Sequence, residues 1–113
     1  MKNETLKDSV VEQLEEIKAQ DIKVIELPDD SSIADFMVIC SGTSSRHVKS
    51  IAILLIKALK EKDMPPIGVE GEDVSEWVLV DCGDVIVHVM QPTTRDYYQL
   101  EKLWEKGLDQ KSE

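Results

Sequence analysis

Positive charge is scarce in this sequence, and the shortage limits the partners that the protein can bind. Thirteen Lys and Arg residues stand against 23 Asp and Glu residues, so the formal net charge is -10 at pH 7. A field of this sign repels phosphate backbones and anionic lipids, and it attracts basic surfaces. We therefore expect no direct recognition of nucleic acid and no membrane binding, and we expect a basic protein as the partner.

Cysteine and long apolar runs are also scarce. Cys40 and Cys82 lie far apart in the chain, and the opening residues MKNETLKDSV contain no apolar segment that would direct secretion. We therefore expect reduced thiols and a cytoplasmic protein. Charged residues interrupt every apolar run, the longest being IAILLI, so no membrane-spanning segment is expected.

A chain of 113 residues predicts one domain with a core large enough to be stable without disulfides or metals. We expect this domain to span residues 1–107 and residues 108–113 to form a frayed tail. The sequence contains no internal repeat and no low-complexity segment.

Residues 76–91, EWVLVDCGDVIVHVMQ, predict a β-hairpin around which the rest of the chain is organised. With Cys82 and Gly83 as a two-residue loop, Asp81 lies opposite Asp84, and this pair sets the register of all the remaining cross-strand pairs. Because side chains alternate across a strand, the hairpin has two chemically different faces. One face is entirely β-branched and predicts core: Val78, Val80, Val85, Val87 and Val89. The other face mixes large apolar, aromatic and titratable groups: Trp77, Leu79, Asp81, Ile86, His88 and Met90.

Apolar periodicity and turn residues predict the other elements. Helices are expected over residues 5–18 and 46–62, and strands over residues 21–27, 33–40 and, briefly, 67–69. The helix over 46–62 is apolar around much of its circumference, so little of it should be exposed. A last helix, capped by Thr93 or Thr94, should end at Gly107. Its expected inward residues are Tyr97, Leu100, Leu103 and Trp104.

This order of elements predicts a mixed α/β sheet of four or five strands with three helices, the first two strands forming a hairpin. Three helices are too few to cover both faces, so we expect them on one face and the Trp77 side at least partly open. An exposed Trp among apolar and acidic residues is typical of an interface hot spot. The alternative is a sheet covered on both faces, and a homodimer through the same face is a further possibility.

Enzyme chemistry has weaker support in the sequence. The Ser41–Ser45 turn precedes a helix and could hold a phosphate, but neither a Walker lysine nor a G-x-G-x-x-G pattern is present. Carboxylates that would hold Mg²⁺ are missing from the residues that follow the turn, VKSIAILLIKALK. His47 and His88 have no zinc-ligand spacing. We expect no catalytic, cofactor or metal residues; the alternative is a residual nucleotide-binding or nucleotidyltransferase enzyme that uses the turn.

Two long motifs give the chain a family likeness. GVEG, followed by EWVLVDCGDVIVHVMQ and TRDYYQLEKLW, resembles the shared motif of the Iojap family, the ribosomal silencing factors. Upstream, DFMVICSGTSSRHVKSIA is similar to that family's other characteristic block. The resemblance runs from about Leu6 to Gly107.

The resemblance implies a nucleotidyltransferase-like fold that has lost its catalytic carboxylates. It also implies binding to ribosomal protein fourteen of the large subunit, which blocks joining of the small subunit and represses translation when nutrients are scarce. The residues that fall in the shared motif are Trp77, Asp81, His88 and Tyr98. Together with the hairpin face, this gives the expected partner site: Trp77, Leu79, Asp81, Ile86, His88, Met90 and Tyr98. Whether Tyr97 or Tyr98 points outward is left open.

Overall fold

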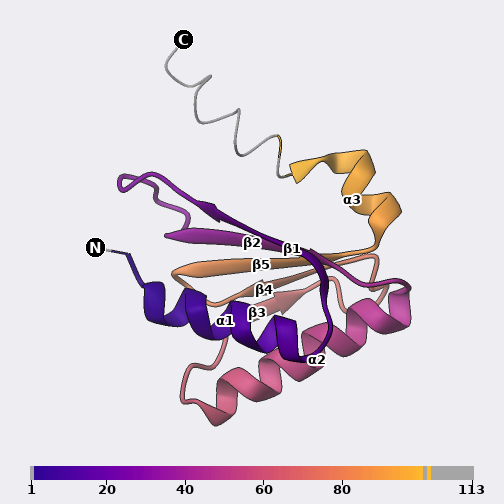
Figure 1. Ribbon diagram of the computed structural model, residues 1–113, viewed down its shortest axis with the longest axis horizontal. Coiled ribbons are helices and arrows are strands. Elements are labelled where there is room, and N and C mark those ends of the chain that lie inside the picture. The colour runs from indigo at the N-terminus through magenta and orange to yellow at the C-terminus, as the bar shows by residue number, and fades with distance from the viewer. Residues whose placement is uncertain (1, 101, 103–113) are drawn as a thin grey trace.

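A computed structural model describes residues 2–100 and 102, which form a five-stranded mixed sheet and three helices (Figure 1). The order is α1 (Glu4–Glu16), β1 (Gln20–Glu26), β2 (Phe36–Ser41), α2 (Ser45–Glu61), β3 (Gly68–Glu70), β4 (Trp77–Asp81), β5 (Val85–Met90) and α3 (Pro92–Tyr98). The strands are arranged β1-β2-β5-β4-β3, with β2 and β5 parallel and the other neighbours antiparallel. The predicted mixed sheet and the first hairpin are confirmed.

The two long helices begin where short polar side chains cap them. Asn3 Oδ1 accepts a hydrogen bond from Leu6 N at 3.1 Å, and Ser44 Oγ accepts one from His47 N at 3.1 Å. Each bond satisfies a backbone N–H that has no partner inside its helix. The Ser/Thr-rich turn after β2 therefore caps α2.

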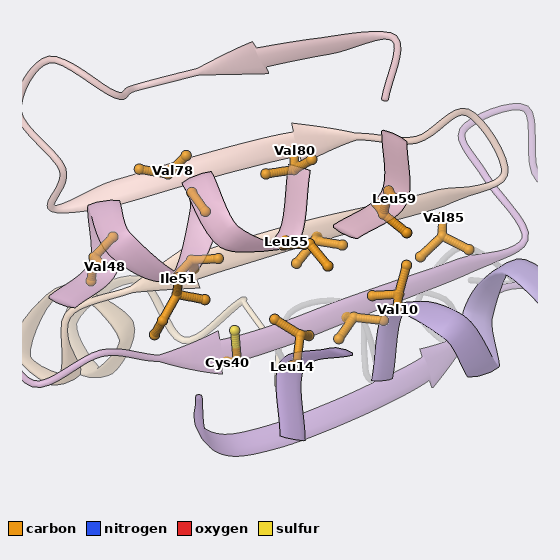
Figure 2. Close-up of a cluster of buried hydrophobic side chains, with 14 of the residues drawn as sticks. Val10, Leu14, Cys40, Val48, Ile51, Leu55, Leu59, Val78, Val80 and Val85 are labelled. Carbon is orange, nitrogen blue, oxygen red and sulfur yellow. The ribbon is translucent and has the colours of Figure 1, made fainter. Parts of the chain in front are cut away.

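The main core lies between the sheet and these two helices (Figure 2). All five valines of the predicted apolar face are buried with no exposed surface. They pack in one cluster with the inward stripe of α1 and α2, and burial of this kind contributes about 25 cal/mol per Å² of apolar surface. The helical side chains of that cluster are Leu6, Val10, Leu14, Val48, Ile51, Ala52, Leu55 and Leu59.

The expectation that α2 would be almost entirely covered is wrong. Ile53 is 47% exposed and Leu54 is 43% exposed. A helix lying on a sheet buries one stripe of its surface, and α1 covers only part of what remains. In the described part of the chain, no helix combines the length and apolar character needed to cross a bilayer.

The expectation of three helices on one face is also wrong. Figure 1 shows α1 and α2 below the sheet and α3 above it. Leu100, which follows α3, is 9% exposed and packs on the upper face with Met37, Ile39 and Met90 in a second cluster. This side of the sheet is thus covered over β2 and part of β5.

The last helix begins differently from the prediction and is interrupted at Gln99, after which Leu100 and Lys102 are again helical. Gln91 is its N-cap and makes no side-chain capping bond, Pro92 opens the helix, and Gln99 ends it in the left-handed conformation with φ 50°. Tyr97 is 81% exposed, so its predicted inward position is wrong, whereas that of Leu100 is confirmed. The predictions for Leu103, Trp104, Gly107 and residues 108–113 lie outside the described residues.

The β4–β5 hairpin differs from the prediction by a register shift of two residues. Cys82 N donates to Val85 O at 2.9 Å, so the loop is Gly83-Asp84. Gly83 has φ +86° at the first loop position, a conformation that glycine adopts without strain. Consequently Trp77 pairs with Met90 rather than with His88. A shift of two residues leaves every side chain on its predicted face, because the period of a strand is two.

Candidate functional site

The part of the upper sheet face that remains accessible lies over β4 and the start of β5. Trp77, Leu79, Asp81 and Ile86 are all half-buried there, and we call these four residues the open face. The short edge strand β3 pairs with β4 at the edge of the sheet. In it, Glu70 pairs with Leu79 and is exposed. The sequence predicted an exposed indole; in the structure the indole is half-buried, with apolar and acidic neighbours.

Two of the predicted surface residues are not at the surface. Met90 has no exposed area and His88 is only 5% exposed. Both lie on β5 between β2 and β4, and Met90 belongs to the second cluster with Leu100. The two side chains support the site from beneath, and the expectation that they are displayed to a partner is corrected.

Trp77 is held in place by His88. The indole Nε1 donates a hydrogen bond to His88 Nδ1 at 2.9 Å, and the ring centroids are 5.8 Å apart. Because Nδ1 accepts this bond, the imidazole is neutral and carries its proton on Nε2. The indole of Trp77 thus has a fixed orientation before any partner arrives, which lowers the entropy lost on binding.

Burial keeps His88 neutral. Desolvation lowers the pKa of His88 from 6.5 to about 4. Nε2 is buried and has no hydrogen-bond partner among the described residues, so nothing there compensates a positive charge. Protonation would also place a hydrogen on Nδ1 and break the bond from Trp77.

The protein should therefore lose stability in mild acid. Between pH 6.5 and about 4 the unfolded chain binds a proton at His88 that the folded chain does not. The stability that neutral His88 contributes to the folded state is therefore fully present above pH 6.5 and is lost as the pH falls toward 4. At pH 5.5 the loss should be about 1 kcal/mol relative to pH 7.5. Chemical denaturation at both pH values would measure it. In His88→Asn, whose amide oxygen can accept the indole hydrogen bond, the difference should shrink by that amount; an unchanged difference would contradict the assignment.

Tyrosines of α3 extend the aromatic surface. Tyr98 lies against Trp77 with ring centroids 5.0 Å apart at 49°, and Tyr97 meets Tyr98 edge-on at 5.0 Å and 86°. Tyr98 is 51% exposed and Tyr97 is 81% exposed, so both point outward. The sequence left open whether Tyr97 or Tyr98 points outward, and in the structure both do.

Negative charge is concentrated in the segment of the chain that carries the open face. Residues 63–94 contain seven Asp and Glu residues and no Lys or Arg, so they carry seven of the ten net negative charges of the chain. This segment forms β3, β4 and β5 with their connecting loops. Asp81 Oδ1 accepts a hydrogen bond from Gly83 N at 2.9 Å, which fixes one carboxylate at the end of the open face.

Sequence reasoning missed the glycine that allows this surface to form. Gly71 has φ +88°, and a Cβ at this position would lie 2.2 Å from the carbonyl oxygen of Trp77. The loop between β3 and β4 therefore packs directly on the backbone that carries the indole. The available signal was the Gly-Glu-Asp sequence after a short strand, which is typical of a turn with positive φ.

The Ser41–Ser45 turn is occupied by its own hydrogen bonds. Thr43 N donates to His47 Nδ1 at 2.8 Å, and Gly42 N donates to Met90 O at 3.1 Å. These backbone groups are the donors that a phosphate would need. Within residues 2–100 and 102, no cluster of three or more His, Cys, Asp or Glu residues could hold a metal ion.

We expect ATP or CTP with Mg²⁺ to leave the melting temperature unchanged, because a ligand that binds the folded state must raise stability once its concentration exceeds Kd. A concentration-dependent rise in a thermal-shift experiment would instead favour the enzyme alternative.

Neither thiol is placed for nucleophilic catalysis. Burial raises the pKa of Cys40 to about 12, and burial together with the nearby Asp81 raises that of Cys82 to about 11. Both cysteines are free and stay protonated at neutral pH.

Known proteins resemble this chain in sequence and in fold. The whole chain, residues 1–113, matches the family described as "Ribosomal silencing factor during starvation". It is 43% identical over 99 residues to "Ribosomal silencing factor RsfS" of Haemophilus influenzae, covering 88% of this chain and 97% of that protein. It is 41% identical over 100 residues to "Mitochondrial assembly of ribosomal large subunit protein 1" of Mus musculus, covering 86% of this chain and 44% of that protein. A crystal structure of a protein from Chromobacterium violaceum superposes with a TM-score of 0.87 at 41% identity, covering 93% of this chain and 88% of that one.

Proposed function

The chain belongs to the ribosomal silencing factor family, and from this premise we propose that it binds ribosomal protein fourteen of the large subunit and prevents the small subunit from joining. It would do so in the cytoplasm, when nutrients are limiting. The names of its relatives refer to ribosomal silencing and to assembly of the large subunit, which supports a role in translation. The residues we propose for the contact are Trp77, Leu79, Asp81, Ile86 and Tyr98.

The observation that carries the proposal is the chemistry of the open face. Trp77 supplies a large, oriented ring, and Leu79 and Ile86 give it apolar neighbours. Asp81 and the exposed Glu76 place negative charge at the edge. A desolvated aromatic centre with a charged rim is the usual composition of a protein interface, and the sign of this rim suits a basic ribosomal protein.

The mechanism is steric. A folded body with a Cα radius of gyration of 13.5 Å, fixed on the surface that the small subunit approaches, occupies space that the joined subunits need. No bond is made or broken. The protein therefore acts by binding alone, and its effect should scale with the fraction of large subunits that it occupies.

Association should slow as salt is added. The negative field around the open face would steer the protein toward a basic surface, and this steering is screened over about 10 Å at 0.1 M salt. Between 0.05 and 0.3 M KCl we expect the association rate constant to fall by about tenfold, with a smaller change in the dissociation rate constant. Stopped-flow mixing with isolated large subunits would measure both. A rate constant independent of salt would remove electrostatic steering from the account.

Co-sedimentation with isolated subunits tests the proposal. The protein should pellet with large subunits in a saturable manner and remain in the supernatant with small subunits. Equal recovery with both subunits, or with neither, would contradict it.

The same face gives the free protein a route to a homodimer, because an aromatic surface without a partner can pair with its copy. Light scattering of the wild type and of Trp77→Ala would show whether the open face is used in this way. If Trp77→Ala still forms a dimer, the dimer interface involves another surface.

A further inference from the structure

A hollow of about 440 Å³ lies beside Trp77, between the loop that precedes β4 and the helix α3. Its walls include Val74, Glu76, Trp77, Tyr97 and Tyr98. Among the residues that the structure describes, no Lys or Arg lines it, and Val74 is itself 64% exposed. The hollow adjoins the open face and combines aromatic, apolar and acidic groups in one place.

The aromatic rings in its wall form a continuous series. Trp77 contacts Tyr98 and Tyr98 contacts Tyr97, each pair with centroids 5.0 Å apart. The two tyrosines leave more than half of their surface uncovered. The face of an aromatic ring carries partial negative charge and attracts cations, most strongly when several rings surround one site.

Fixed charge in and near the hollow has the same sign. The exposed side chain of Glu76 forms part of its wall, and Glu72 and Asp73 precede it in the same loop. Arg95 is the basic residue nearest in sequence to the tyrosines of the hollow. It donates a hydrogen bond to Ser41 Oγ at 2.8 Å and lines a different hollow with Lys23. The positive charge of α3 is thus directed away from the aromatic hollow.

We propose that this hollow receives an arginine side chain of the partner protein. The guanidinium would stack on the tyrosines and Trp77 and pair with the Glu76 carboxylate, while Val74 contacts the alkyl stem. Arginine fits better than lysine because its planar group both stacks on rings and pairs with carboxylates through two hydrogen bonds. The inference rests on the proposed function, which it deepens by naming the chemistry that the partner must present.

One arm of the test measures affinity for isolated large subunits. Tyr97→Leu, which removes the ring but keeps an apolar side chain, should weaken binding by about five- to tenfold. Tyr97→Phe, which keeps the ring, should bind at least about threefold more tightly than Tyr97→Leu. Ile53→Ala, an exposed apolar position on the outer side of α2, is the control that should bind as the wild type does. An affinity of Tyr97→Leu equal to that of the wild type would overturn the assignment.

The other arm needs no ribosome. N-acetylarginine methylamide is titrated into the free protein while the indole N–H resonance of Trp77, assigned by its loss in Trp77→Phe, is followed by NMR. The arginine compound should shift this resonance in a saturable manner, and the neutral citrulline analogue should not. Equal shifts with both compounds, or no shift with either, would overturn the proposal.

The two arms separate the two hypotheses. If the wild type fails to bind large subunits, the proposed function fails, and the arginine titration still decides what the hollow recognises. If the wild type binds while Tyr97→Leu is unaffected and arginine causes no selective shift, only the hollow has been assigned wrongly.

Discussion

Trp77→Ala is expected to weaken binding to the large ribosomal subunit by about 2 kcal/mol or more, which is about 30-fold in Kd. The substitution removes the largest side chain of the open face and the ring against which Tyr98 lies. Because the indole N–H already bonds to His88, the ring is oriented in the free protein and a partner loses little entropy in covering it. Co-sedimentation at a series of protein concentrations would give the two dissociation constants.

A matched control for this substitution lies on the other side of the molecule. Ile53→Ala also truncates a large, partly exposed apolar side chain, but on the outer face of α2. Its affinity should match that of the wild type, and circular dichroism should show that both variants are folded. If Trp77→Ala and Ile53→Ala bind equally well, the open face is not the docking surface.

Gly71→Ala is expected to cost about 3 kcal/mol of folding stability and to reduce binding as well. A side chain in the positive-φ conformation costs about 1–3 kcal/mol, and forcing extra volume into a packed site costs a similar amount. Here the new Cβ would meet the carbonyl oxygen of Trp77 at 2.2 Å, so the strand that carries the indole must move. Urea denaturation would measure the loss.

Gly68→Ala, in the adjoining strand β3, provides the comparison. A Cβ at Gly68 has no atom within 4 Å, and its φ is not in the left-handed region. We expect a change within about 0.5 kcal/mol, the usual range for surface positions. Equal destabilisation by the two substitutions would show that the packing of Gly71 on Trp77 has been misread.

The two-faced hairpin could be predicted because its chemistry depends only on the alternation of side chains. The five valines are buried as expected, although the register is shifted by two residues. The shift went unforeseen because Gly83 can serve a two-residue loop at either position, and only the observed bond between Cys82 and Val85 identifies which. Alternation alone therefore gives the faces of a strand but leaves its pairing open.

The composition of β2 indicated that the second face of the sheet is covered, although the hairpin pattern suggested an open face. The strand β2, FMVICS, is buried at all six positions. A strand that is apolar on both sides is typical of a sheet covered on both faces. The composition of β2 therefore indicates that other residues cover Met37 and Ile39, and that the open face is restricted to β4 and the edge of the sheet.

The burial of His88 and Met90 follows from the same cause. Both lie on β5 next to β2, where the cover is, whereas Leu79 and Asp81 lie on β4 beside the short edge strand. Composition marked all six residues of the hairpin face as unusual, but Met90 is covered by the cluster that includes Leu100, and His88 is covered by the indole of Trp77. These contacts are a property of tertiary packing that no local pattern contains.

The most direct test of the central claim is subunit joining itself, followed by light scattering when isolated small and large subunits are mixed with Mg²⁺. An excess of the wild-type protein, added to the large subunits first, should suppress the rise in scattering, and Trp77→Ala at the same concentration should leave most of the rise intact. A full rise with the wild type, or equal suppression by both proteins, would contradict an account in which the open face around Trp77 holds the protein where the small subunit must dock.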